Sequence, residues 1–116
     1  MTPEEKQLLL KDLCARLPYG IKVKNVKNNF DINNFNHNAE EIKFLIEEYG
    51  IKPYLHPISS MTDEEKEELY QKTGFKIDDF ILGLSAIDWF NEHHFDYRGL
   101  IEKGLAFEAP EGMYDN

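Results

Sequence analysis

Residues 85–105 hold the side chains most able to do chemistry in this 116-residue chain. This segment contains the only tryptophan and two of the four histidines, interleaved with acidic and apolar residues. A histidine beside a carboxylate can act as a general acid or base. The candidate ligand-binding residues are therefore His93, His94, Asp96 and Arg98, provided that they line a common pocket.

A metal site is the second possibility for these residues. Adjacent helical residues point about 100° apart, so His93 and His94 cannot bind one ion as histidines four residues apart do. Asp88, Glu92 and Asp96 recur every four residues and could present carboxylates in a row if a helix ran that far. A solvated acidic face explains the same spacing, and we predict neither a metal nor a cofactor.

Motifs for covalent catalysis and phosphate binding are missing from the sequence. There is no G-x-S-x-G nucleophile motif, no G-x-G-x-x-G pattern and no Walker pattern. The single cysteine, Cys14, lies on an apolar stripe and reads as a small buried hydrophobe. An enzyme is thus less favoured than a protein without catalytic activity.

The charge distribution bears on the kind of partner. The formal net charge is −9, which disfavours nucleic acid and anionic membranes. Residues 10–27 nevertheless hold five basic residues and one acid. Lys22, Lys24 and Lys27 on an expected strand form a weak candidate surface for nucleic acid, or an edge that meets an acidic partner. We expect another protein as the partner and leave the oligomeric state open.

Location follows from what the sequence lacks. One cysteine cannot form an intramolecular disulfide. The first thirty residues do not resemble a signal peptide, and no apolar run approaches the ~18–20 residues of a membrane span. A reducing cytoplasm is therefore the expected compartment, without membrane attachment.

Helix starts are the clearest structural signals. Thr2, Asn38 and Thr62 each precede glutamates in the manner of a helix cap. Apolar residues then recur every three or four positions in the first two segments, while the third is mostly polar. The expected ends are at three helix breakers: Pro18, Gly50 and Gly74.

Strands are expected between the first two helices. Residues 21–26 alternate apolar and basic side chains, residues 27–29 suit a turn, and residues 30–33 would return antiparallel with Phe30 and Ile32 inward. Residues 51–57 contain two prolines and read as an extended connector. The apolar run at 80–84 fits a third strand or a buried helical turn, and we favour the strand.

The C-terminal part should close the domain. A helix is expected from Ser85, followed by a sharp turn and a short last helix over 97–103 with Asp96 as its cap. Residues 108–116 read as a loosely ordered acidic tail. Alternatively, they form a linear docking motif with Met113 and Tyr114 as its anchors.

Together these elements predict one α+β domain over residues 1–107. It would consist of an N-terminal helix, a short antiparallel β-hairpin or sheet, and several helices packed on it. The expected core combines the apolar face of the first helix with apolar residues from the later elements: Ile21, Val23, Phe30, Ile32, Ile42, Leu45, Ile46, Trp89, Phe90, Leu100 and Ile101.

Three blocks of sequence, residues 11–24, 51–69 and 87–114, resemble a group of small uncharacterised proteins from gut anaerobes and their phages or mobile elements. The blocks include LCARLPYG, IKPYL and HHFDYRGLIEKGLA. The resemblance implies a cytoplasmic protein of bacterial or phage origin. It carries no activity, and no functional residue is transferred from it.

The leading expectation is a non-catalytic binding or accessory protein. The alternative is a small ligand- or metal-binding domain, or an enzyme, with its site near His93, His94, Asp96 and Arg98. A concave cavity on which these four side chains converge would favour the alternative. A flat or fully packed surface there would favour the binding protein.

Overall fold

The computed structural model describes residues 1–75 and 84–114. Three helix caps form at the positions predicted from the sequence. Helices α1 (Pro3–Arg16), α2 (Ala39–Tyr49) and α3 (Asp63–Thr73) begin after Thr2, Asn38 and Thr62. Each cap side chain accepts a backbone N–H three residues on, and a glutamate returns the bond. This reciprocal bonding satisfies donors that an isolated helix end leaves free.

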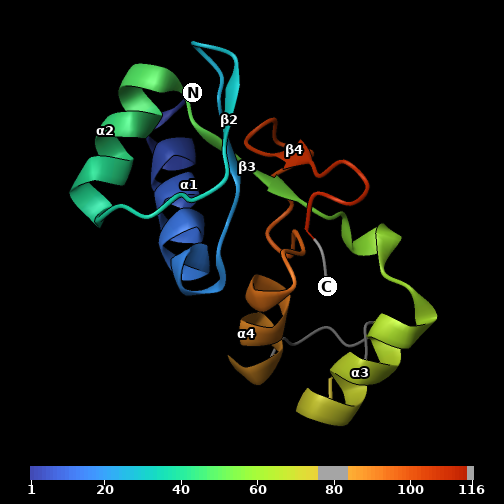
Figure 1. The fold of residues 1–116 in the computed structure, drawn as a ribbon. Coiled ribbons are helices and arrows are strands. Elements are labelled where there is room, and N and C mark those ends of the chain that lie inside the picture. The colour runs from blue at the N-terminus through green and yellow to red at the C-terminus, as the bar shows by residue number, and fades with distance from the viewer. Residues whose placement is uncertain (76–83, 115–116) are drawn as a thin grey trace.

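Four strands form one mixed sheet in the order β2-β1-β3-β4. Strand β1 (Val23–Asn25) pairs antiparallel with β2 (Phe30–Ile32) and with β3 (Lys52–Leu55). Strand β3 pairs in parallel with β4 (Phe107–Glu108). The described residues therefore make an α+β fold, as predicted, with helices α1 and α2 beside each other against the sheet (Figure 1).

The connector predicted at residues 51–57 is an inner strand of this sheet. Pro53 lies opposite Val23, and the Tyr54 N–H donates to the Lys22 carbonyl at 3.0 Å. The prediction that the prolines keep this segment extended is confirmed. The prolines did not prevent pairing, because a proline removes only its own donor and leaves the neighbouring residues free to bond.

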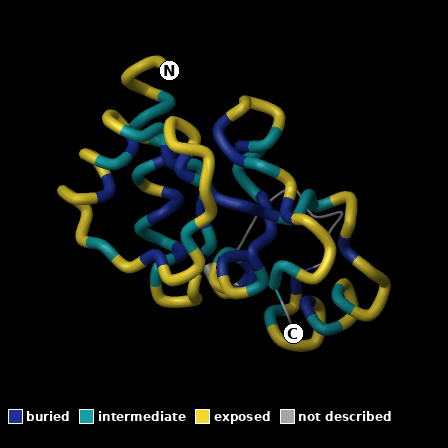
Figure 2. Tube along the Cα trace, turned by 45° about the horizontal axis from the view of Figure 1, so that its top comes forward, coloured by how far each residue is buried: buried dark blue, intermediate teal, exposed yellow. Residues whose placement is uncertain are grey.

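Two apolar clusters form the core. The larger joins α1, α2 and the sheet and consists of Leu9, Leu13, Ile21, Val23, Phe35, Ile42, Ile46, Ile51, Leu55, Leu100, Leu105 and Ala106. The smaller joins α3 to α4 (Leu84–Glu92) and consists of Met61, Leu69, Phe75, Ala86, Trp89, Phe90 and Phe95. Figure 2 shows buried segments inside and exposed ones around them. Phe30, predicted to face inward, is 50% exposed because β2 is an edge strand.

The last helix predicted over 97–103 is a series of turns. Gly99, inside that range, has a φ of 72°, which a right-handed helix excludes. Asp96 still caps, because its carboxylate accepts the N–H groups of Leu100 and Ile101 at 2.8 and 2.9 Å. Of the apolar run at 80–84, all but Leu84 lies outside the described residues, and Leu84 begins α4.

The C-terminal segment is bound more closely than the expected loose tail over 108–116. Glu108 belongs to β4, and the Ala109 N–H donates to the Leu55 carbonyl at 2.8 Å. The Tyr114 hydroxyl bonds to the backbone of Lys22 and of Tyr54. Residues 108–114 thus pack on the sheet, through contacts that join positions up to 92 residues apart.

Candidate functional site

His94 is built into the fold at the end of α4. It has a φ of 63°, and its imidazole stacks on the Tyr114 ring with 3.7 Å between centroids. Its carbonyl accepts the His56 N–H at 2.8 Å, and its ring is almost fully buried. Burial, followed by the nearby Arg16 charge, lowers the pKa of His94 to about 4. The imidazole is therefore neutral near pH 7 and serves as a packed ring.

His93 and Asp96 point to different surroundings. The His93 ring stacks on Trp89 at 4.2 Å, and its Nε2 lies 3.5 Å from a carboxylate oxygen of Glu68 on α3. The Asp96 side chain is buried and accepts two backbone N–H groups as a cap. Among the described residues, no side-chain hydrogen bond joins His93 or Asp96 to His94, and the carboxylate beside His93 is that of Glu68 rather than Asp96.

Arg98 belongs to a charge cluster that the sequence analysis missed. Its Nε donates to Asp12 Oδ1 at 3.1 Å, and the other oxygen of Asp12 accepts from Arg16 at 2.9 Å. Arg16 also donates to the Phe95 carbonyl at 2.7 Å, and the side chains of Asp12 and Arg16 are fully buried. The one available signal was the four-residue spacing of this pair within an otherwise apolar helix face.

None of the three hollows lined by described residues brings the four candidate residues together. A groove of about 350 Å³ includes Asp96 but none of the other three, and it is lined by Pro57, Ile58, Ser59, Asp96, Tyr97, Gly99, Ile101 and Glu102. The Asp96 carboxylate already accepts two backbone N–H groups, and the other acid that lines the groove is Glu102.

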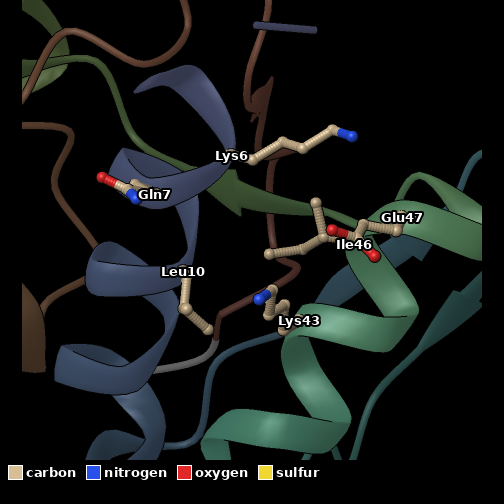
Figure 3. Close-up of a pocket in the computed structure, with 6 residues that line it drawn as sticks. All are labelled: Lys6, Gln7, Leu10, Lys43, Ile46 and Glu47. Atoms are coloured by element: carbon tan, nitrogen blue, oxygen red, sulfur yellow. The ribbon is translucent and has the colours of Figure 1, made fainter. Parts of the chain in front are cut away.

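Two other hollows lie on the helices. A crevice between α1 and α2 holds about 40 Å³ and is lined by Lys6, Gln7, Leu10, Lys43, Ile46 and Glu47 (Figure 3). That volume accepts little more than one or two waters. A shallow surface of about 400 Å³ on α2 is lined by His37, Glu40, Glu41, Phe44 and Leu45. Neither hollow brings together side chains for catalysis.

Metal ligands are not grouped either. Helix α4 ends at Glu92, so Asp96 does not continue the row begun by Asp88 and Glu92. Across residues 1–75 and 84–114, no three His, Cys, Asp or Glu side chains are arranged to hold an ion.

The basic surface predicted on β1 has a different membership in the structure. Lys22 and Lys24 lie over the rings of Tyr114 and Phe107, with 5.6 and 5.3 Å from Nζ to the ring centre. Lys52 on β3 is opposite Lys24 in the antiparallel register, and its Nζ lies 5.9 Å from the Phe107 centre. We call Lys22, Lys24 and Lys52 with Phe107 and Tyr114 the lysine face.

Lys27 is not part of the lysine face. Its N–H donates to the Tyr49 carbonyl at 3.1 Å, and its Nζ lies 5.9 Å from the Tyr49 ring centre. Lys27 lies in the turn between β1 and β2, and its odd separation from Lys22 and Lys24 would point it to the other face even in a continued strand. The third lysine of the face is instead Lys52, from the segment predicted to be a connector.

The comparisons and the helix lengths add two findings. Within the described part of the chain, no helix has the length and apolar character that crossing a bilayer requires. Comparison with known proteins finds no matching family model, no matching curated protein and no matching solved structure.

Proposed function

We propose that this chain is a non-catalytic binding protein that recognises another protein through the lysine face. The observation that carries the proposal is the gathering of three half-buried lysines on one side of the sheet. None of the three forms an ion pair with a described carboxylate, although the chain has 22 acidic residues. Uncompensated charge at a surface steers association with a complementary partner.

The dispersal of the four candidate residues supports binding over catalysis. His93, His94, Asp96 and Arg98 each make contacts that hold the fold, and no hollow lined by described residues includes more than one of them. A ligand pocket would instead need convergent polar groups with free donors or acceptors. In keeping with the resemblance described above, we place the protein in the cytoplasm of a bacterium.

The test is an affinity capture from a bacterial lysate at physiological salt, with and without nuclease, read by mass spectrometry. The bait proteins are the wild type and the Lys24→Gln/Lys52→Gln variant. A stoichiometric protein that survives nuclease and is lost with the variant supports the proposal. A partner that both baits retain equally would move the binding surface elsewhere, and loss upon nuclease treatment would indicate nucleic acid.

A further inference from the structure

Two of the three ammonium groups on the lysine face are held by backbone carbonyls. Lys22 Nζ donates to the Met113 carbonyl at 2.6 Å, and Lys52 Nζ donates to the Gly104 carbonyl at 2.7 Å. Since an ammonium has three N–H donors, each keeps two for a further acceptor. Lys24 makes no hydrogen bond with described residues through Nζ, and it stands over Phe107. The donors of Lys22 and Lys52 are therefore oriented before a ligand arrives, which lowers the entropy cost of binding.

The face carries an electrostatic cost that an anion would remove. Lys24 and Lys52 are direct cross-strand neighbours, and like charges in that position destabilise a sheet. The nearest acid in the register is Asp31, opposite Lys24 on β2. Its carboxylate accepts the Tyr54 hydroxyl at 2.5 Å and makes no ion pair with either lysine. The local balance remains positive on a protein of net charge −9.

From this arrangement we propose that the lysine face binds an acidic segment of the partner protein, with glutamate or aspartate side chains on Lys22, Lys24 and Lys52. The proposal rests on the proposed function and names the chemistry of its partner. An extended peptide presents every second side chain to the same side, about 7 Å apart. That repeat matches Lys22, just before β1, and Lys24 within it, while Lys52 lies beside Lys24 on the neighbouring strand β3.

Two observations favour an acidic peptide over a single-stranded nucleic acid. Nucleic-acid platforms stack bases on open aromatic rings, but two ammonium groups already lie over Phe107 and one over Tyr114. Three lysines would also neutralise only about three phosphates, which is a weak counterweight to the repulsion from a net charge of −9. A short carboxylate-bearing segment needs fewer contacts and brings less charge near the acidic body.

Fluorescence anisotropy with a labelled peptide of alternating glutamate and serine tests the inference directly. We expect saturable binding at low salt that weakens as salt rises, and about tenfold weaker binding by Lys24→Gln/Lys52→Gln. The matched control is Lys11→Gln/Lys66→Gln, which removes the same charge from exposed positions on α1 and α3. It should retain wild-type affinity. Circular dichroism establishes that all variants are folded.

Four results would overturn the inference. The first is no binding of the glutamate peptide, and the second is equal loss of affinity in both double variants. The third is preference for an oligothymidine of equal length, and the fourth is a glutamine–serine peptide that binds as well as the acidic one. If the acidic peptide fails while a captured protein is still lost with Lys24→Gln/Lys52→Gln, the proposed function stands and only the acidic segment is wrong.

Discussion

The imidazole of His94 lies face to face with the Tyr114 ring, with 3.7 Å between centroids and 17° between planes. The Tyr114 hydroxyl accepts the Lys22 N–H at 2.9 Å and donates to the Tyr54 carbonyl at 2.8 Å. One tyrosine near the C-terminus thus joins the end of α4 to β1 and β3. It also stands beneath the Lys22 ammonium, so the C-terminal segment helps to shape the lysine face.

Replacing Tyr114 by phenylalanine should separate the hydrogen bonds from the ring stack. Tyr114→Phe keeps the contact with His94 but removes both backbone bonds of the hydroxyl, which leaves the Lys22 N–H without its acceptor. We expect the free energy of unfolding to fall by about 1–3 kcal/mol. Urea denaturation followed by tryptophan fluorescence measures the change. An unaltered midpoint would show that this segment is not bound in solution.

Acid should destabilise the protein through His94. Burial is the largest cause of its pKa of about 4, and the charge of Arg16 and the neighbouring His56, His93 and Lys22 add to it. The pKa is about 6.5 in the unfolded chain. As the pH falls below 6.5, the unfolded state binds a proton that the native state excludes, so the contribution of His94 to stability decreases down to about pH 4 and then levels off. The full loss is about 3 kcal/mol.

His94→Asn tests this pH dependence. Asparagine tolerates the φ of 63° and does not titrate, so the slope of stability between pH 6.5 and 4.5 should become shallower. Burial also lowers the pKa of His56, so a smaller slope of the same sign should remain. Tyr114→Phe keeps the ring on His94 and should keep the wild-type slope. Equal slopes in wild type and His94→Asn would contradict the assignment.

Features that depend on neighbouring residues were predictable from the sequence. The caps at Thr2, Asn38 and Thr62 need only partners three residues away, and all three helices begin there. The α+β class followed from these helices and the alternation of residues 21–26. Local chemistry decides both, so no knowledge of the rest of the chain was needed.

Features that depend on distant partners were not predictable. The strand at residues 52–55 looks like a connector until β1 and β4 pair with it. Tyr114 looks like part of a tail until its hydroxyl meets Lys22, 92 positions away. For the candidate site, the sequence shows ionisable side chains at His93, His94 and Asp96 but not their partners. In the structure the two histidines stack on aromatic rings, and Asp96 caps a turn.

Trp89 should be a main support of the smaller core cluster. It is 3% exposed, and its ring stacks on His93 and, at 5.8 Å, on Phe95. Trp89→Ala is expected to lower the free energy of unfolding by about 3–5 kcal/mol, because it leaves a cavity and removes buried apolar area. Trp89→Phe fills part of that space and should cost less. Thermal unfolding by circular dichroism serves as the readout, and an unchanged melting temperature in Trp89→Ala would place the ring at the surface.

Loss of the buried Asp12 carboxylate should destabilise the protein more than loss of Arg98, its more exposed ion-pair partner. Asp12→Ala leaves Arg16 charged and buried without its ion-pair partner, at an expected cost of about 3–5 kcal/mol. Arg98→Ala removes the more exposed pair and should cost about 1 kcal/mol or less. The double variant Asp12→Leu/Arg16→Met should recover much of the stability lost in Asp12→Ala. Chemical denaturation of the three variants side by side decides among these outcomes.

Lys27 and Lys52 provide the sharpest comparison between the surface predicted from sequence and the lysine face. The sequence groups Lys27 with Lys22 and Lys24, whereas the structure puts Lys27 over Tyr49 and brings in Lys52.

Lys27→Gln and Lys52→Gln change the net charge equally, so a general electrostatic effect would weaken binding of the glutamate–serine peptide equally in both. Because exposed charges are screened beyond about 8 Å at physiological salt, a local site should distinguish them. We expect Lys52→Gln to weaken the peptide several-fold, by about 1 kcal/mol, and Lys27→Gln to retain wild-type affinity. The same anisotropy titration could show the opposite, a loss of affinity in Lys27→Gln but not in Lys52→Gln. That result would favour the surface of Lys22, Lys24 and Lys27 predicted from the sequence and exclude β3 from the binding site.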